Sequence, residues 1–203
     1  VSRRDFVAMG IAAGIVAAAG SASAADMPVT AKDVDIKTPD GTCNAAFIHP
    51  TTGSHPAVII WADAFGLRPV LREMGRTLAK EGYSVLVPNP FYRLVREAGL
   101  EYKSFDFGNT TDRAKLTPLM GSINAAGAAE GDALAFIAWL DQQKEVNKAK
   151  KIGTQGYCMG GPLVVRTAAV SDRIGAGGSF HGGGLVTANP NSPHLLAPKI
   201  HAR

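Results

Sequence analysis

A cysteine framed by glycines constrains this chain more than any other feature of its sequence. The segment 156–161 reads Gly-Tyr-Cys-Met-Gly-Gly, with a short run ending in Thr-Gln before it and a helix-forming stretch, 162–170, after it. Strand, tight turn, nucleophile and helix in this order are typical of a nucleophile elbow. Glycines allow the unusual backbone angles and close helix–strand approach of such a turn, and a helix N-terminus favours a thiolate. We therefore predict that Cys158 is a nucleophile; the alternative is a buried structural cysteine in a glycine-rich turn.

Strands and helices are expected to alternate around this motif. Apolar runs bounded by turn residues are typical of buried parallel strands, and apolar residues at helical spacing predict helices. Strands are expected at 57–61, 83–88, 151–155 and 174–180, helices at 69–80 and 125–143, and an antiparallel edge hairpin at 34–37 and 44–48. The segment 101–118 shows little periodicity and is expected to be an irregular excursion over the site. The pattern predicts an α/β fold, with a mainly parallel sheet covered by helices on both faces.

Length and composition fit one globular domain. The chain has 203 residues, of which 46% are hydrophobic and 19% charged, and its net charge is +4. The basic residues are scattered, apart from a cluster at 148–151 that fits a solvated helix end, so no nucleic-acid partner is expected. Cys43 and Cys158 are too few for a disulfide framework, and their spacing matches no metal site. A bond between them would contradict the nucleophile prediction, because a disulfide sulfur is no thiolate.

The first 24 residues are predicted to be an export signal. Arg3 and Arg4 stand directly before an apolar stretch, 7–19, and Ala22-Ser23-Ala24 fits signal-peptidase cleavage before Ala25. The paired arginines resemble the bacterial twin-arginine signal, which implies the Tat export machinery as a partner and a periplasmic or secreted domain, 25–203. An uncleaved anchor is the alternative, but the apolar stretch is shorter than the roughly 20 residues that span a bilayer. We expect no stable membrane anchor after cleavage.

Four motifs, in order along residues 38–203, resemble the dienelactone hydrolase family of the α/β-hydrolase fold. The glycine-framed cysteine at 156–161 is the last of them. The other three are Ile-Ile-Trp-Ala-Asp-Ala-Phe-Gly at 59–66, the helix-to-strand segment 72–83, and Pro-Asn-Pro-Phe-Tyr-Arg at 88–93.

The resemblance implies roles for individual residues. Cys158 would attack the carbonyl carbon of an ester or lactone, and the backbone N–H groups of Met159 and Ala64 would form the oxyanion hole. Asp63 stands where the family carries an acidic residue, usually the longer Glu, that can contact the thiol. Arg93 matches an arginine that holds a substrate carboxylate, so the substrate is expected to be anionic. Further substrate contacts are expected from the neighbouring Phe91 and Tyr92, and from His181 at the end of strand 174–180.

The base and the acid of a catalytic triad are not evident. In this fold the acid and then the histidine follow the nucleophile, and Asp172, His181, His194 and His201 match neither place well. Residues 198–203 are predicted to open the strand that delivers the triad Asp in the family. We therefore expect the chain to be truncated at its C-terminus, with an incomplete sheet and a fragment that is inactive alone.

The leading hypothesis is an exported hydrolase that cleaves a small carboxylic ester or enol-lactone, of the carboxymethylenebutenolidase type. One alternative is a non-catalytic periplasmic binding protein on the same fold. Another is a glutamine-amidotransferase-like cysteine site, against which the motifs at 59–66 and 88–93 argue. No metal cluster or nucleotide loop is visible, so no cofactor is expected.

Overall fold

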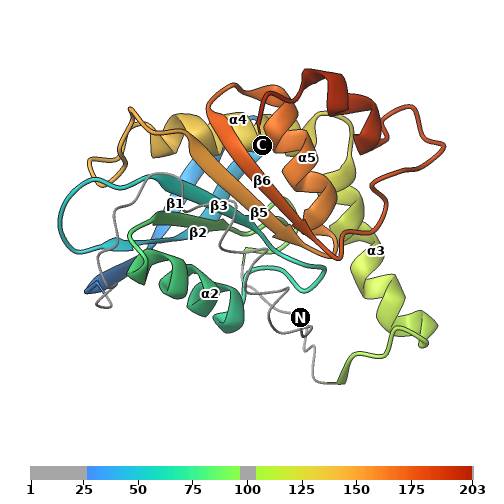
Figure 1. The fold of residues 1–203 in the computed structure, drawn as a ribbon. Helices are drawn as coiled ribbons and strands as arrows, with labels where there is room; N and C mark the ends of the chain where they lie inside the picture. The colour runs from blue at the N-terminus through green and yellow to red at the C-terminus, as the bar shows by residue number, and fades with distance from the viewer. Residues whose placement is uncertain (1–26, 97–103, 203) are drawn as a thin grey trace, which may run out of the picture.

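The computed structural model describes residues 27–96 and 104–202. The predicted export signal lies outside these residues. Six strands form one sheet in the order β1-β2-β4-β3-β5-β6 (Figure 1). Their bounds are Val29–Thr38 for β1, Gly41–Pro50 for β2, Ala57–Trp61 for β3, Ser84–Pro88 for β4, Ile152–Tyr157 for β5 and Ile174–Phe180 for β6. The hairpin of β1 and β2 joins antiparallel to β4, whereas β4, β3, β5 and β6 are parallel. The predicted, mainly parallel α/β-hydrolase sheet is confirmed.

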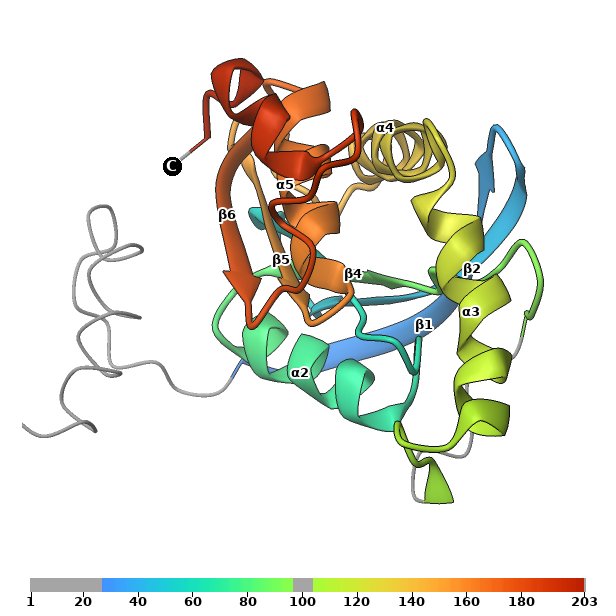
Figure 2. The same cartoon turned by 90° about the vertical axis from the view of Figure 1, so that its right-hand side faces the viewer.

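Helices cover both faces of this sheet, because side chains alternate along its strands. Ile60 and Val85 face the helix α2 (Pro69–Lys80), whereas Ile59 and Leu86 belong to a second buried cluster on the opposite face. That opposite face carries α4 (Ala128–Leu140) and α5 (Gly160–Val170), as Figure 2 shows. The two clusters bury both faces of the central strands. Because β3, β4 and β5 are parallel, their carboxyl ends lie at the same edge of the sheet.

Most predicted elements are present, and the hairpin is longer than predicted. The excursion predicted at 101–118 is wrong in its second half, because the helix α3 runs from Thr110 to Asn124 with Pro118 inside it. The side chain of Asn109 caps this helix by accepting from the N–H groups of Thr111 and Asp112. Gly127, at a φ of 77°, then separates α3 from α4, which therefore starts later than predicted.

The strand opening predicted at 198–203 is not found in its described part, residues 198–202. Residues Pro193–Lys199 instead form the 3-10 helix η3, which packs against α5. Pro193 and Pro198 explain the difference, since proline lacks the N–H that a central strand needs. Among the described residues, no helix is both long and apolar enough to cross a membrane.

Candidate active site

The glycine-framed cysteine forms a sharp turn between β5 and α5. Cys158 stands between the last residue of β5 and the start of α5 with a φ of 52°, in the left-handed region that residues other than glycine rarely adopt. A Cβ on Gly156 would collide with the carbonyl group of Gly160, so strand and helix approach more closely than any side chain would allow. The side chain of Cys158 is partly exposed and its sulfur is not in a disulfide. This geometry is that of a nucleophile elbow.

Neighbouring strands hold the turn on both sides. The N–H of Cys158 donates to the carbonyl oxygen of Phe180 at 3.0 Å, which ties the turn to the end of β6. On the other side, a Cβ on Gly160 would lie 2.5 Å from the carbonyl oxygen of Trp61. The start of α5 therefore rests directly on the end of β3, from which the loop carrying Ala64 departs.

Two buried residues near the turn, Met159 directly after Cys158 and Ala64 on the loop after β3, have backbone N–H groups that can donate to a partner. Ala64 and Met159 are buried in the same hydrophobic cluster. Neither of their N–H groups donates a hydrogen bond within the part of the chain that the structure describes. Buried donors without a partner are unusual, because such groups are costly unless something accepts from them. They are therefore suited to stabilise a negatively charged oxygen.

The carboxylate of Asp63 is bound by an arginine. Arg68 donates to both of its oxygens at 2.6 Å, and one oxygen also accepts from the N–H of Phe65 at 2.9 Å. No hydrogen bond joins Asp63 to the Cys158 thiol in the described residues. In this arrangement Asp63 shapes the loop after β3, and the predicted thiol contact is not made.

Arg93 is also occupied by carboxylates. It donates to both oxygens of the buried Asp132 at 2.8 and 2.9 Å, and to Asp40 at 2.9 Å. Its side chain is only 12% exposed and lies over the Tyr92 ring. Burial of Arg93 opposes its charge, but the hydrogen bonds to Asp132 and Asp40 outweigh this and raise the pKa of the guanidinium. The geometry does not support the predicted role of Arg93 in holding a substrate carboxylate.

The other two residues of the motif at 88–93 with predicted substrate contacts, Phe91 and Tyr92, are held by contacts within the protein. The Tyr92 hydroxyl lies 2.6 Å from Thr38 Oγ1 and donates to Asp132 at 2.8 Å. Burial, the largest cause, raises the pKa of Tyr92 and keeps the phenol neutral. Phe91 is buried against the hydrophobic cluster that contains Ala64. Both side chains thus fix the loop after β4, and nothing in their contacts tests a role in substrate binding.

His181 lies next to the elbow. It follows β6 directly, adopts a φ of 41°, and its exposed ring centroid is 6.3 Å from that of Tyr157. No hydrogen bond to the Cys158 thiol is present from it or from any other histidine or carboxylate of residues 27–96 and 104–202. His194 is bonded instead to Ser192 at 2.7 Å. The described residues thus place a partly exposed thiol in the turn, with no base hydrogen-bonded to it.

The sequence did not predict a group of aromatic residues from the loop after β3 and the segment before α3, which we call the phenylalanine cluster: Phe65, Phe105 and Phe107. Their ring centroids are 4.8 to 5.8 Å apart in edge-to-face pairs. Phe105 packs against the buried cluster that contains Ala64 and Met159, whereas Phe107 is 56% exposed. Two phenylalanines two residues apart in an otherwise polar segment were the only signal for this cluster in the sequence.

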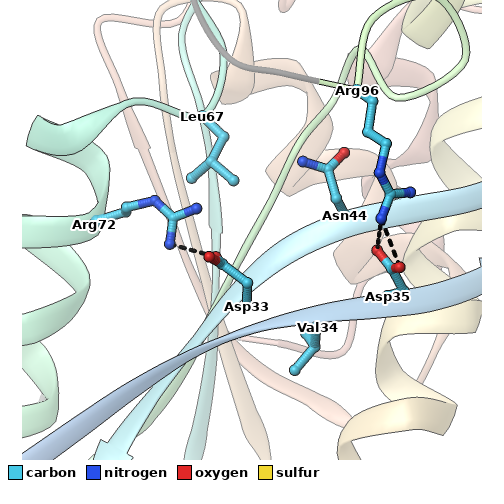
Figure 3. Close-up of a pocket in the computed structure, with 7 residues that line it drawn as sticks. All are labelled: Asp33, Val34, Asp35, Asn44, Leu67, Arg72 and Arg96. Atoms are coloured by element: carbon cyan, nitrogen blue, oxygen red, sulfur yellow. Dashed lines mark hydrogen bonds and ion pairs between the residues drawn. The ribbon is translucent and has the colours of Figure 1, made fainter.

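A separate pocket of about 370 Å³ lies on the α2 side of the sheet, near its β1 edge (Figure 3). Arg72 and Arg96 reach into it, but each binds an aspartate of β1, Asp33 or Asp35, at 2.6 Å. None of the elbow or oxyanion residues lines this pocket. Within the described ranges, no three His, Cys, Asp or Glu side chains gather in a way that could hold a metal ion.

Comparisons with known proteins identify relatives of this chain. The chain is 26% identical to the carboxymethylenebutenolidase of Rhodococcus opacus, over 64% of this chain and 45% of that one. It is 25% identical to the carboxymethylenebutenolidase of Pseudomonas putida, over 82% of this chain and 67% of that one. It spans about half the length of the first curated relatives that it matches.

Solved structures give the same result for the fold. A dienelactone hydrolase-like promiscuous phosphotriesterase from metagenomic libraries superposes with a TM-score of 0.65 at 24% identity, over 86% of this chain and 66% of that one. A cold-adapted esterase from an Arctic intertidal metagenomic library superposes with a TM-score of 0.61 at 16% identity, over 86% of this chain and 69% of that one. The model of the dienelactone hydrolase family matches residues 43–203. The chain therefore belongs to the dienelactone hydrolase family.

Proposed function

We propose that the protein hydrolyses a small carboxylic ester or enol-lactone through the thiolate of Cys158. The observation that carries this proposal is the strained turn at Cys158, which presents the sulfur at the start of α5 beside the unpaired N–H groups of Ala64 and Met159. Carboxymethylenebutenolidases among the relatives support the ester or lactone class.

The chemistry follows from these groups. The thiolate adds to the carbonyl carbon, and the two N–H groups stabilise the negative charge on the former carbonyl oxygen. Collapse of this intermediate expels the alkoxide, which takes a proton, and leaves an acyl-thioester on Cys158. Water then adds to the thioester, releasing the carboxylic acid and the thiol. Within residues 27–96 and 104–202, no histidine or carboxylate is hydrogen-bonded to the Cys158 thiol.

Substitution of the nucleophile in the full-length protein tests the proposal. Cys158→Ala should lower kcat/KM for 4-nitrophenyl acetate by at least about a thousandfold. The wild-type protein, stopped early with acid, should carry one acetyl group on the peptide containing Cys158. Cys43→Ala is the matched control, since its thiol is buried and lies outside the elbow. Turnover that survives in Cys158→Ala would contradict covalent catalysis, and binding without turnover in the wild type would favour the non-catalytic alternative.

We also propose that the protein is exported by the twin-arginine route. The support is the Arg3-Arg4 pair, the apolar stretch after it and the Ala-Ser-Ala cleavage site. Residues 1–30, fused to a fluorescent reporter that folds before export, should carry it to the bacterial periplasm. The double substitution Arg3→Lys, Arg4→Lys should retain the reporter inside the cell. Equal export of both fusions would contradict this route.

A further inference from the structure

We infer that Asp63 and Arg68 are positioning residues for the ester reaction, because their ion pair fixes the peptide group that carries the N–H of Ala64. This inference rests on the proposed function and adds two residues to its site. It gives Asp63 a role through its neighbours in the loop, in place of the thiol contact expected from the sequence. Three features carry it: the pair itself, the hydrogen bonds of the peptide group before Ala64, and the position of the loop against the turn at Cys158.

Asp63 and Arg68 form a pair across the loop that joins β3 to α2. Two N–H groups of the guanidinium donate to the two carboxylate oxygens, each at 2.6 Å, in the planar arrangement for which arginine is suited. Only 13% of the Arg68 side chain and 21% of the Asp63 side chain are exposed, and a pair buried to this degree is screened less than a surface pair. Arg68 directly precedes α2, and its carbonyl oxygen accepts from the N–H groups of Leu71 and Arg72. The pair therefore ties the loop to a packed helix.

The peptide group between Asp63 and Ala64 is held by contacts on its carbonyl side. Its carbonyl oxygen accepts from the N–H of Gly66 at 3.0 Å, and the Asp63 carboxylate accepts from the N–H of Phe65 at 2.9 Å. Arg68 also donates to the carbonyl oxygen of Gly66 at 3.2 Å, so it holds the far end of the same turn. A trans peptide group is planar, and its N–H and C=O point in opposite directions. Contacts that fix the Asp63 carbonyl group therefore fix the direction in which the Ala64 N–H points.

The start of this loop lies against the turn between β5 and α5. A Cβ on Gly160, two residues after the thiol, would stand 2.8 Å from the carbonyl oxygen of Ala62, two residues before Ala64. Under the proposed function, the Ala64 N–H stabilises the oxygen that becomes negative when the thiolate adds to the carbonyl carbon. A donor held in one direction before the reaction stabilises that charge better than a donor that must reorient. The pair is therefore expected to speed acylation of the thiol without changing the reactivity of the thiol itself.

Two reactions of the same thiol distinguish this role from a general structural one. Acetylation by 4-nitrophenyl acetate passes through a negatively charged oxygen, whereas in alkylation by iodoacetamide the sulfur–carbon bond forms as iodide leaves, and no such oxygen arises. In the full-length protein, Asp63→Asn should lower kcat/KM for 4-nitrophenyl acetate by about ten- to hundredfold. The amide can still accept from the Phe65 N–H but cannot form the ion pair. The rate of Cys158 alkylation should stay within about twofold of the wild type.

Substitution of the arginine should separate the two rates in the same way. Arg68→Lys keeps the charge but lacks the planar guanidinium, so it should lower kcat/KM by about three- to tenfold and leave the alkylation rate unchanged. In the double variant Asp63→Asn, Arg68→Lys the loss should be no larger than in Asp63→Asn alone, since both changes remove one pair. Asp35→Asn is the matched control, because it breaks a two-contact pair with Arg96 between β1 and the segment after β4. It should leave both rates as in the wild type.

The outcomes separate this inference from the proposed function. Unchanged kcat/KM in Asp63→Asn would overturn the inference. A parallel loss of alkylation would also overturn it, because Asp63 would then act on the thiol or on the turn as a whole. Additive losses in the double variant would overturn the pair as the acting unit. Turnover retained in Cys158→Ala would overturn the proposed function itself, whereas Cys158-dependent turnover that is insensitive to Asp63→Asn would overturn this inference alone.

Discussion

The carbonyl oxygen of Trp61 lies 2.5 Å from the point where a Cβ on Gly160 would stand. The first turn of α5 thus rests on the end of β3 with no room for a side chain, and this contact places Cys158 beside the loop of Ala64. Because the obstacle is backbone, it cannot rotate aside as a side chain would.

Gly160→Ala should therefore destabilise the protein by about 2 kcal/mol or more and lower ester turnover. Gly121→Ala is the matched control, since it lies within α3 and a Cβ there meets nothing within 4 Å. The control should be neutral or gain about 0.5–1 kcal/mol, because alanine has less freedom in the unfolded chain. Urea unfolding of both variants measures the difference, and equal stability of the two would show that the elbow can adjust.

The two thiols should differ in reactivity. Cys43 has no exposed surface and donates weakly to the carbonyl oxygens of Asn44 and Asn89, whereas Cys158 is partly exposed at the start of α5. Iodoacetamide at pH 7.5 should alkylate Cys158 at least about tenfold faster than Cys43, as read by peptide mass spectrometry. In urea the rates should converge. Faster labelling of Cys43 in the folded protein would contradict the arrangement.

Two arginine–aspartate pairs of similar geometry should differ in their contribution to stability. Asp132→Asn breaks the buried pair with Arg93 and should cost about 3–5 kcal/mol, because the largely buried guanidinium then keeps only the half-exposed Asp40 as a carboxylate partner among the described residues. Asp35→Asn breaks the exposed pair with Arg96 and should cost at most about 1 kcal/mol. Urea unfolding compares them. A similar, small cost for both would mean that Arg93 does not depend on Asp132 and is free for substrate.

Stability should fall in mildly alkaline solution because of Cys43. Burial, followed by the nearby charge of Asp132, raises the pKa of this thiol far above its ordinary value of about 8.5. Below that pH the thiol is protonated in both states; above it the unfolded chain loses the proton and the folded chain does not. The free energy of unfolding should therefore decrease by up to about 1.4 kcal/mol per pH unit above pH 8.5.

Urea midpoints between pH 8 and 9.5 measure this slope below the range in which tyrosines ionise. In Cys43→Ala the slope should be flatter than in the wild type, although the variant starts from a lower stability. Parallel curves for the two proteins would assign the alkaline loss to other groups.

Local signals were sufficient to predict most of the sheet and the turn. The apolar run Ala57–Trp61 and the amphipathic helix Pro69–Lys80 were predicted with the observed bounds, because burial of one face leaves a period in the sequence. The helix α3 was hidden by Pro118 and by its weak apolar period. It forms because Asn109 caps it and because Leu116 and Ile123 reach the core.

The partners of the site residues could not be predicted in the same way. Arg93 and Asp132 are 39 residues apart, one on the loop after β4 and the other on α4, so tertiary packing brings them together. The motif at 88–93 therefore suggested an arginine available for substrate. Tertiary contacts determine which charged side chains are already paired, and a sequence motif does not contain that information.

The left-handed backbone at Cys158 also bears on how this protein can evolve. A side chain in that conformation costs of order 1 kcal/mol, whereas glycine adopts it freely. Selection for stability alone would therefore replace this cysteine with glycine, and under the proposed function the chemistry of the thiol is what retains it. Descendants that give up turnover are expected to lose the thiol early, so the residue at this position distinguishes working enzymes from copies that have taken on another task.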